Sequence, residues 1–305
     1  MTSGRYTIVG LGEIVWDLLP TGPQLGGAPA NFAYFASLLG NHAVVASRVG
    51  TDELGQETLL RLHQSGLPTA YVQRDETRPT GTVRVRVDEQ GQPDFTITEM
   101  AAWDGLEFTP QWQALAAAAD AVCFGALAQR SAASRETIRK FLSATRKDAL
   151  RVFDVNLRQS FYSADIISDS LRQAQVVKLN HLELPIVAAM FDLAGDDDEA
   201  RARALLRAYS LEMVCVTRGA RGSLLVNDAE AVSHAGIPVT TADAVGAGDA
   251  FTAALAHHYL RGARLAEISR AANLLGAWVA SQVGAMPTVE PAILRQIIEG
   301  AEVSW

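Results

Sequence analysis

The chain has 305 residues, of which 49% are hydrophobic and 20% are charged, as in a globular protein with a large core. Its formal net charge of −8 and isoelectric point near 5.3 argue against a basic surface for nucleic acid, and no apolar stretch is long enough for a membrane span. Because no signal-peptide pattern is present and Cys123 and Cys215 both lie in apolar runs, we expect reduced thiols in a cytoplasmic protein without nucleic-acid or membrane partners.

Strand and helix patterns alternate along most of the chain. In chain order the patterns predict a strand at 6–11, a helix at 29–39, a strand at 43–49, a helix at 53–65, a hairpin at 80–98, a helix at 111–119, a strand at 121–124, a helix at 133–147, a strand at 150–155, a helix at 163–174, a strand at 176–179, helices at 181–191 and 197–209, strands at 213–216, 223–227 and 231–234, and helices at 247–261, 265–283 and 290–300. Such alternation indicates an α/β fold around a parallel sheet with right-handed crossovers. Gly10 and Gly12 lack the third glycine of a dinucleotide-binding loop, so a dehydrogenase is rejected.

The hairpin interrupts this rhythm. Residues 80–88 and 94–98 alternate between polar and apolar side chains, which is typical of an antiparallel pair with one face in water. We expect a single domain over residues 1–305, in which about 70–100, with the segment near 12–18, form a small β-sheet lid. The half-polar sheet also leads us to expect a homodimer that pairs through this lid.

The segment 243–251 joins a glycine-rich turn to a helix that begins near Ala247. The N–H groups of Gly246, Ala247 and Gly248 lie at the positive end of that helix, where they can bind an anion. Asp249 lies in the same turn, and an anion site beside a carboxylate base suits phosphoryl transfer to a hydroxyl group. A plain glycine-rich turn, with Asp249 merely favourable in the first helical turn, accounts for the same pattern.

Polar residues follow most of the predicted strands, where parallel α/β sheets bind their ligands. These residues are Asp17, Gly50 to Asp52, Asn156 to Arg158, Asn180 to Glu183 and Thr217 to Gly222.

Four stretches resemble the ribokinase/PfkB family of carbohydrate kinases, and the likeness covers nearly the whole chain. They are Gly26-Gly27 with Asn31 and the helix to Gly40, Asn180 to Glu183, Thr217 to Gly222, and Asp243 to Asp249. The resemblance implies a ribokinase-like three-layer sandwich around a mostly parallel sheet, with a small β-sheet lid. It also implies an ATP-dependent carbohydrate kinase that uses Mg²⁺.

In this family the aspartate that matches Asp249 is the general base, and the amides of residues 246–248 stabilise charge on the transferred phosphoryl group. Asp243 resembles a position whose backbone helps to bind a monovalent cation. Ala244 replaces the Thr or Ser often found beside it, so potassium activation is left open.

On the nucleotide side, Asn180 and Glu183 resemble the pair that organises Mg²⁺ and its waters, with Glu183 acting through water. The same spacing fits a helix capping box, and the two roles can coexist. The residues expected to contact ATP are Asn180, Thr217, Gly219, Gly222, Gly248 and Asn273. A plain turn is the alternative for the segment after Thr217.

The residues expected to contact the sugar are Asp17, Gly26, Gly27, Asn31, Trp103, Asn156 and Arg158. Alternatives are a tight turn for Gly26-Gly27 with Asn31 simply exposed, a core position for Trp103 and a surface ion pair for Arg158. Residues 154–158 resemble fructokinases and 2-keto-3-deoxygluconate kinases, so fructose is the expected substrate and the keto acid the alternative. A catalytically silent sugar or nucleotide sensor is the hypothesis from a different class.

Overall fold

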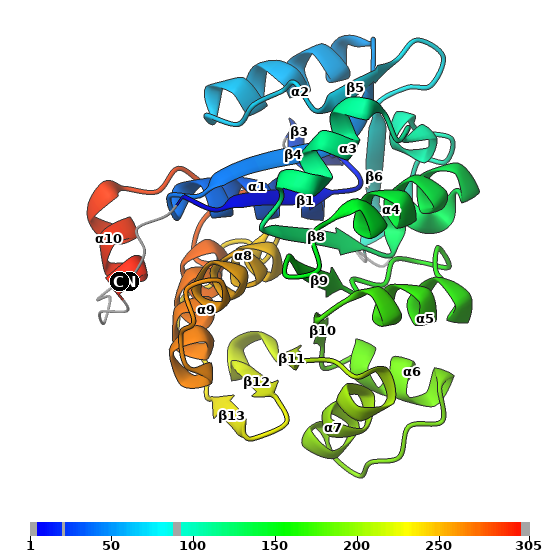
Figure 1. Ribbon diagram of the computed structural model, residues 1–305. Helices are drawn as coiled ribbons and strands as arrows, with labels where there is room; N and C mark the ends of the chain where they lie inside the picture. Colours follow the sequence, from blue (N-terminus) through cyan, green and yellow to red (C-terminus); the bar gives the residue numbers. More distant parts are fainter. Residues whose placement is uncertain (1–4, 20–21, 88–92, 300–305) are drawn as a thin grey trace.

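The computed structural model describes residues 5–19, 22–87 and 93–299 and contains a large sheet of nine strands (Figure 1). The strand order is β13-β12-β11-β10-β9-β8-β1-β4-β5. The bounds are β1 Thr7–Leu11, β4 His42–Gly50, β5 Val72–Asp75, β8 Ala121–Gly125, β9 Leu150–Asp154, β10 Val176–Asn180, β11 Met213–Thr217, β12 Ser223–Val226 and β13 Ala231–His234. The seven strands from β11 through β10, β9, β8, β1 and β4 to β5 pair in parallel, and β12 and β13 pair antiparallel. This confirms the predicted mostly parallel sheet.

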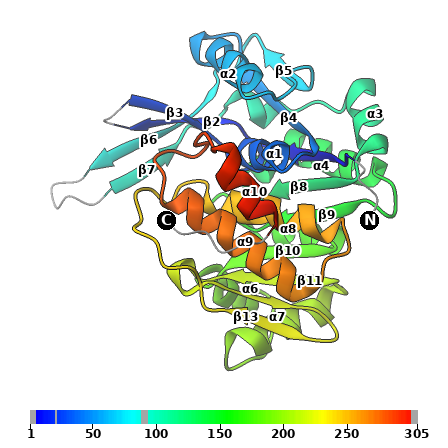
Figure 2. The same ribbon diagram turned by 90° about the vertical axis from the view of Figure 1, so that its left-hand side faces the viewer.

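A second, smaller sheet projects from the main body (Figure 2). It is formed by β2 Val15–Leu19, β3 Gly22–Gly26, β6 Gly81–Val87 and β7 Pro93–Ile97, in the order β3-β2-β6-β7. The predicted turn of the hairpin lies outside the described residues. Two boundaries differ from the prediction. Residues 72–75, expected in the lid, pair with β4 in the large sheet, and residues 22–26 form a strand that was not predicted.

Helices cover both faces of the large sheet and complete three layers (Figures 1 and 2). One face carries α1 Ala28–Leu38, α2 Glu53–Gln64, α8 Ala247–Tyr259, α9 Leu265–Ala280 and α10 Pro291–Glu299. The other carries α3 Pro110–Ala118, α4 Ala132–Ala144, α5 Ala164–Gln173, α6 Glu183–Met190 and α7 Asp198–Tyr209. No helix in the described ranges is long and apolar enough to span a membrane.

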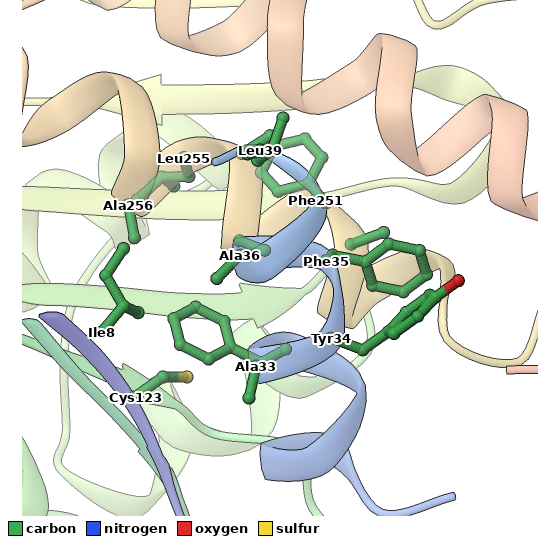
Figure 3. Close-up of a cluster of buried hydrophobic side chains, with 14 of the residues drawn as sticks. Ile8, Ala33, Tyr34, Phe35, Ala36, Leu39, Cys123, Phe251, Leu255 and Ala256 are labelled. Carbon is green, nitrogen blue, oxygen red and sulfur yellow. The ribbon is translucent and has the colours of Figure 1, made fainter. Parts of the chain in front are cut away.

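The packing of α1 against α8 positions the candidate site. Phe35 on α1 and Phe251 and Leu255 on α8 are buried in one cluster with Ile8 of β1 (Figure 3). Each such side chain stabilises the fold by about 1.5–3 kcal/mol through burial. Gly10 of β1 permits the close approach, because any side chain there would collide with the carbonyl group of Pro29 at the start of α1. The amino ends of α1 and α8 are thereby held together.

Candidate active site

Helix α8 begins at Ala247, as predicted, and no side-chain hydrogen bond caps its amino end. Gly246 precedes it with a φ of 81°, and a β-carbon at this position would lie 2.5 Å from the carbonyl oxygen of Ala285. Only glycine fits both conditions. Within the described residues, the N–H groups of Gly248 and Asp249 have no backbone acceptor. These groups fit a phosphate oxygen.

Asp249 meets Asn31 at the junction of the two helices. The side-chain amide of Asn31 donates a hydrogen bond of 2.7 Å to Oδ2 of Asp249. Burial and then the charge of Asp154 raise the pKa of Asp249 to about 6, against the lowering effects of Asn31, Lys178 and Arg158. A carboxylate with a pKa slightly below neutral is ionised at pH 7 and basic enough to accept a proton in the transition state.

Three of the residues predicted to contact the sugar lie on or beside the small sheet. Asp17 lies on β2, and burial raises its pKa to about 6, while the charge of Arg158 opposes that shift. A β-carbon on Gly26 would lie 3.0 Å from a carboxylate oxygen of Asp17. Gly27 precedes α1 with a φ of 107°. The small sheet therefore brings Asp17 and the two glycines to the amino end of α1.

Asn156 and Arg158 follow the carboxyl end of β9. Asn156 has a φ of 41°, in the left-handed region that asparagine tolerates better than most residues. Arg158 is exposed, and its charge acts on Asp17 and Asp249. No ion pair within 4 Å holds Arg158 in the described part of the chain, so the surface ion-pair alternative is not what the structure shows.

On the nucleotide side, Asn180 and Glu183 form the predicted capping box. Oδ1 of Asn180 accepts the N–H group of Glu183 at 3.0 Å, and Oε2 of Glu183 accepts that of Asn180 at 2.8 Å. The other oxygen of Glu183 accepts the N–H group of Leu157 at 2.8 Å. With each oxygen already holding a backbone donor, Glu183 fits contact with Mg²⁺ through water better than direct ligation.

Thr217 lies beside Asn180, because the two residues are partners in the β10–β11 register. The turn that follows is closed by a hydrogen bond of 2.7 Å from the N–H group of Arg218 to the carbonyl of Gly222. Gly219 and Gly222 have φ values of 59° and 79°, which favour glycine. The turn thus places Thr217, Gly219 and Gly222 together at the carboxyl end of β11.

Two predicted contacts disagree with the structure. Trp103 is fully buried, and the guanidinium carbon of Arg130 lies 4.0 Å from the centre of its ring, so the ring cannot stack on a sugar. Its core alternative is correct. Asn273 is also buried and donates from its side-chain amide to Ser223 and Ser269, each at 2.7 Å. Because that amide is used inside the fold, the structure does not support a contact with ATP.

Asp243 anchors the loop before α8. Its carboxylate accepts the N–H groups of Val245 at 3.0 Å and of Gly284 at 3.2 Å. The side chain thus shapes the loop and leaves the backbone carbonyl group of Asp243 outside these contacts. Potassium binding at Asp243 stays a prediction.

Sequence reasoning missed three buried ionisable groups. Glu13 is 3% exposed, its Oε2 has no hydrogen-bond partner, and burial raises its pKa to about 7. Asp154 and Lys178 form a buried ion pair. The sequence does carry a signal for each of them. An ionisable residue within an apolar strand, or directly after one, is expected to be buried and then needs a partner or a shifted pKa.

Comparison with known proteins gives consistent matches. Residues 22–292 match the pfkB family carbohydrate kinase. The fructokinase of Escherichia coli is 31% identical over 259 residues, 80% of this chain and 81% of that protein. A solved sugar kinase from Pyrococcus horikoshii has a TM-score of 0.82 at 25% identity and covers 96% of this chain and 99% of its own. A fructokinase from Vibrio cholerae O395, solved with fructose, ADP and calcium ion, shares the fold with a TM-score of 0.80 at 24% identity, covering 96% and 99%.

Proposed function

The chain belongs to the pfkB family of carbohydrate kinases and is an ATP-dependent sugar kinase, and from this premise we propose that it phosphorylates fructose to fructose 6-phosphate. The 31% identity to the fructokinase of Escherichia coli supports fructose as the acceptor. The fructokinase from Vibrio cholerae O395, solved with fructose, ADP and calcium ion, supports a nucleotide and a divalent cation as ligands of this chain.

The contact between Asn31 and Asp249 carries the proposal. Asn31 fixes one oxygen of Asp249 by the 2.7 Å hydrogen bond, so the carboxylate is oriented before a substrate arrives. Asp249 accepts the proton of a primary hydroxyl group. As the hydroxyl oxygen bonds to the γ-phosphorus of ATP, the bond from that phosphorus to the β–γ bridging oxygen breaks and ADP leaves. The free N–H groups at the start of α8 stabilise the negative charge during the transfer.

Two other features of the site fit the proposal. Mg²⁺, when bound, would neutralise charge on the phosphates. We propose that Glu183, whose oxygens already accept backbone N–H groups, would hold one of its waters. The small sheet carries Asp17, so we propose that it acts as a lid that brings this carboxylate to the sugar. Asn156 and Arg158, from the carboxyl end of β9, complete the proposed sugar side.

A second candidate substrate is 2-keto-3-deoxygluconate. The observation that favours it is Arg158, which is exposed and donates from Nη1 to the carbonyl of Leu157 at 3.2 Å, but has no ion-pair partner within the described residues. Its charge is therefore available to a substrate carboxylate. Arg84 is a further exposed cation on β6, and the side chain of Arg86 lies outside the described part. A silent sensor is the alternative from another class, and the open anion site beside Asp249 speaks against it.

ADP release measured with a panel of sugars tests the proposal. We expect turnover with fructose to exceed that with 2-keto-3-deoxygluconate, ribose and nucleosides. The Asp249→Asn variant should lose turnover by about 10²- to 10⁴-fold while it keeps most of its affinity for ATP. Preference for the keto acid would replace fructose as the substrate. Nucleotide binding without turnover of any sugar would favour the sensor, and a fully active Asp249→Asn enzyme would exclude Asp249 as the base.

A further inference from the structure

A buried ion pair lies on the sheet face that α8 covers. Asp154 ends β9 and Lys178 is its partner in the β9–β10 register. The ammonium group of Lys178 donates to both carboxylate oxygens of Asp154 at 3.0 Å, and the two residues are 6% and 3% exposed. Burial alone would lower the pKa of Lys178, but the charges of Asp154, Glu183 and Asp249 outweigh it and raise that pKa. Lys178 therefore stays charged.

The pair touches the first turn of α8. A β-carbon on Gly248 would lie 3.1 Å from Nζ of Lys178, so the missing side chain of this glycine leaves the space that the ammonium group occupies. The hydroxyl oxygen of Thr252, one turn further along α8, lies 2.9 Å from the carbonyl of Gly248 and 3.1 Å from Oδ2 of Asp154. Its single proton can go to either acceptor, and both contacts connect the pair to the helix start.

We propose that Lys178, held by Asp154, is a positioning residue for phosphoryl transfer that supplies a fixed positive charge behind the first turn of α8. The charge lies against Gly248, whose N–H group has no backbone acceptor within the described residues and is one of those proposed to bind phosphate. A preorganised charge of this kind, kept from water, favours the ionised base and the anionic transition state. The inference rests on the proposed role of Asp249 as the base.

The charges around Asp249 predict pKa shifts of opposite sign when the lysine or the aspartate of the pair is replaced. Asp154 raises the pKa of Asp249, whereas Lys178 and Arg158 lower it. The other titratable groups that interact with Asp249 are Glu13 after β1 and the buried thiol of Cys123 on β8. Removal of the lysine charge must therefore raise the pKa of Asp249, and removal of the aspartate charge must lower it.

The experiment titrates Asp249 directly, by carboxyl ¹³C NMR of the full chain without substrates, and in parallel follows kcat/KM against pH. The Asp249→Asn variant assigns the resonance. Lys178→Met should move the Asp249 titration up by about one pH unit, and Asp154→Asn should move it down by about one unit. Lys178→Arg keeps the charge and should leave the titration in place. Lys140 is exposed on α4, on the opposite face of the large sheet, so Lys140→Met removes a lysine charge away from α8 and is the matched control.

A purely structural pair would change the melting temperature and leave the Asp249 titration alone, and that result would overturn the proposal. Shifts of the same sign in Lys178→Met and Asp154→Asn would overturn it too. Should Lys178→Met not fold, an unmoved titration in Asp154→Asn is sufficient to refute the proposal. A fully active Asp249→Asn enzyme would instead show that the base itself was wrongly assigned.

Discussion

Replacing Asn31 with alanine removes the one neutral group that hydrogen-bonds to Asp249 within the described residues. A hydrogen bond to a charged group contributes about 1.5–3 kcal/mol. At 1.36 kcal/mol per pKa unit, its loss should raise the pKa of Asp249 by about 1–2 units above its present value of about 6. The ionised fraction of Asp249 at pH 7 should then fall from about 0.9 to between about 0.5 and 0.1.

The assay is ADP release with fructose between pH 5 and 9, because kcat/KM reports the pKa of the base in the free enzyme. Asn31 is also a proposed sugar contact, so KM should rise at every pH. The pH at which kcat/KM falls on the acidic side separates this loss of sugar binding from the change in the pKa of Asp249. Asn41→Ala is the matched control, since Asn41 is equally buried but bonds to Ala36 and His257. An acidic limb that stays near pH 6 in folded Asn31→Ala would refute the reasoning.

Three further predictions concern the stability of the chain and its assembly. In thermal unfolding, Gly27→Ala should lower stability by on the order of 1–3 kcal/mol, because Gly27 has a φ of 107° and a β-carbon there would lie 2.7 Å from the carbonyl of Glu13. Gly22→Ala is the control: Gly22 has a φ of 119° but no atom near its missing side chain, so the loss of stability should be smaller. Burial raises the pKa of Glu13 from 4.5 to about 7, so the contribution of its protonation to stability is complete below pH 4.5 and is lost as the pH rises through 7. Between pH 5 and 8 the free energy of unfolding of Glu13→Gln should therefore rise relative to the wild type by up to about 3 kcal/mol. Light scattering at micromolar concentration should show a homodimer that pairs through the small sheet, and a monomer would contradict this.

The order of elements could be predicted because the buried strands are short apolar runs and most helices carry a regular apolar face. β9 and β10 were found within one residue of their observed ends. β3, by contrast, reads Gly-Pro-Gln-Leu-Gly and has no strand pattern of its own. It is a strand because β2 pairs along its whole length, which only the tertiary structure supplies.

The helix start and carboxylate of the candidate site could be read from the sequence because they lie in contiguous residues. Residues 246–249 hold the proposed anion-binding turn and the carboxylate within one helical turn. Trp103 could not be assigned, because a tryptophan after a hairpin fits a sugar platform and a core position equally well. Its contact with Arg130 decides for the core, and 27 positions separate the two residues along the chain.

Stability alone does not explain why Asp154 and Lys178 form a buried ion pair beside the site. A buried pair loses solvation on both partners, and hydrophobic residues of similar size are often equally stable in its place. Valine or leucine on both strands would extend the apolar packing under α8. The charged pair instead places a cation against Gly248 and an anion near Asp249, with opposite effects on the pKa of that carboxyl. Burial and Asp154 favour the protonated acid, while Lys178, Asn31 and Arg158 favour the carboxylate. Their balance holds the pKa near 6, where Asp249 is ionised in neutral solution and still strong enough as a base to take a hydroxyl proton.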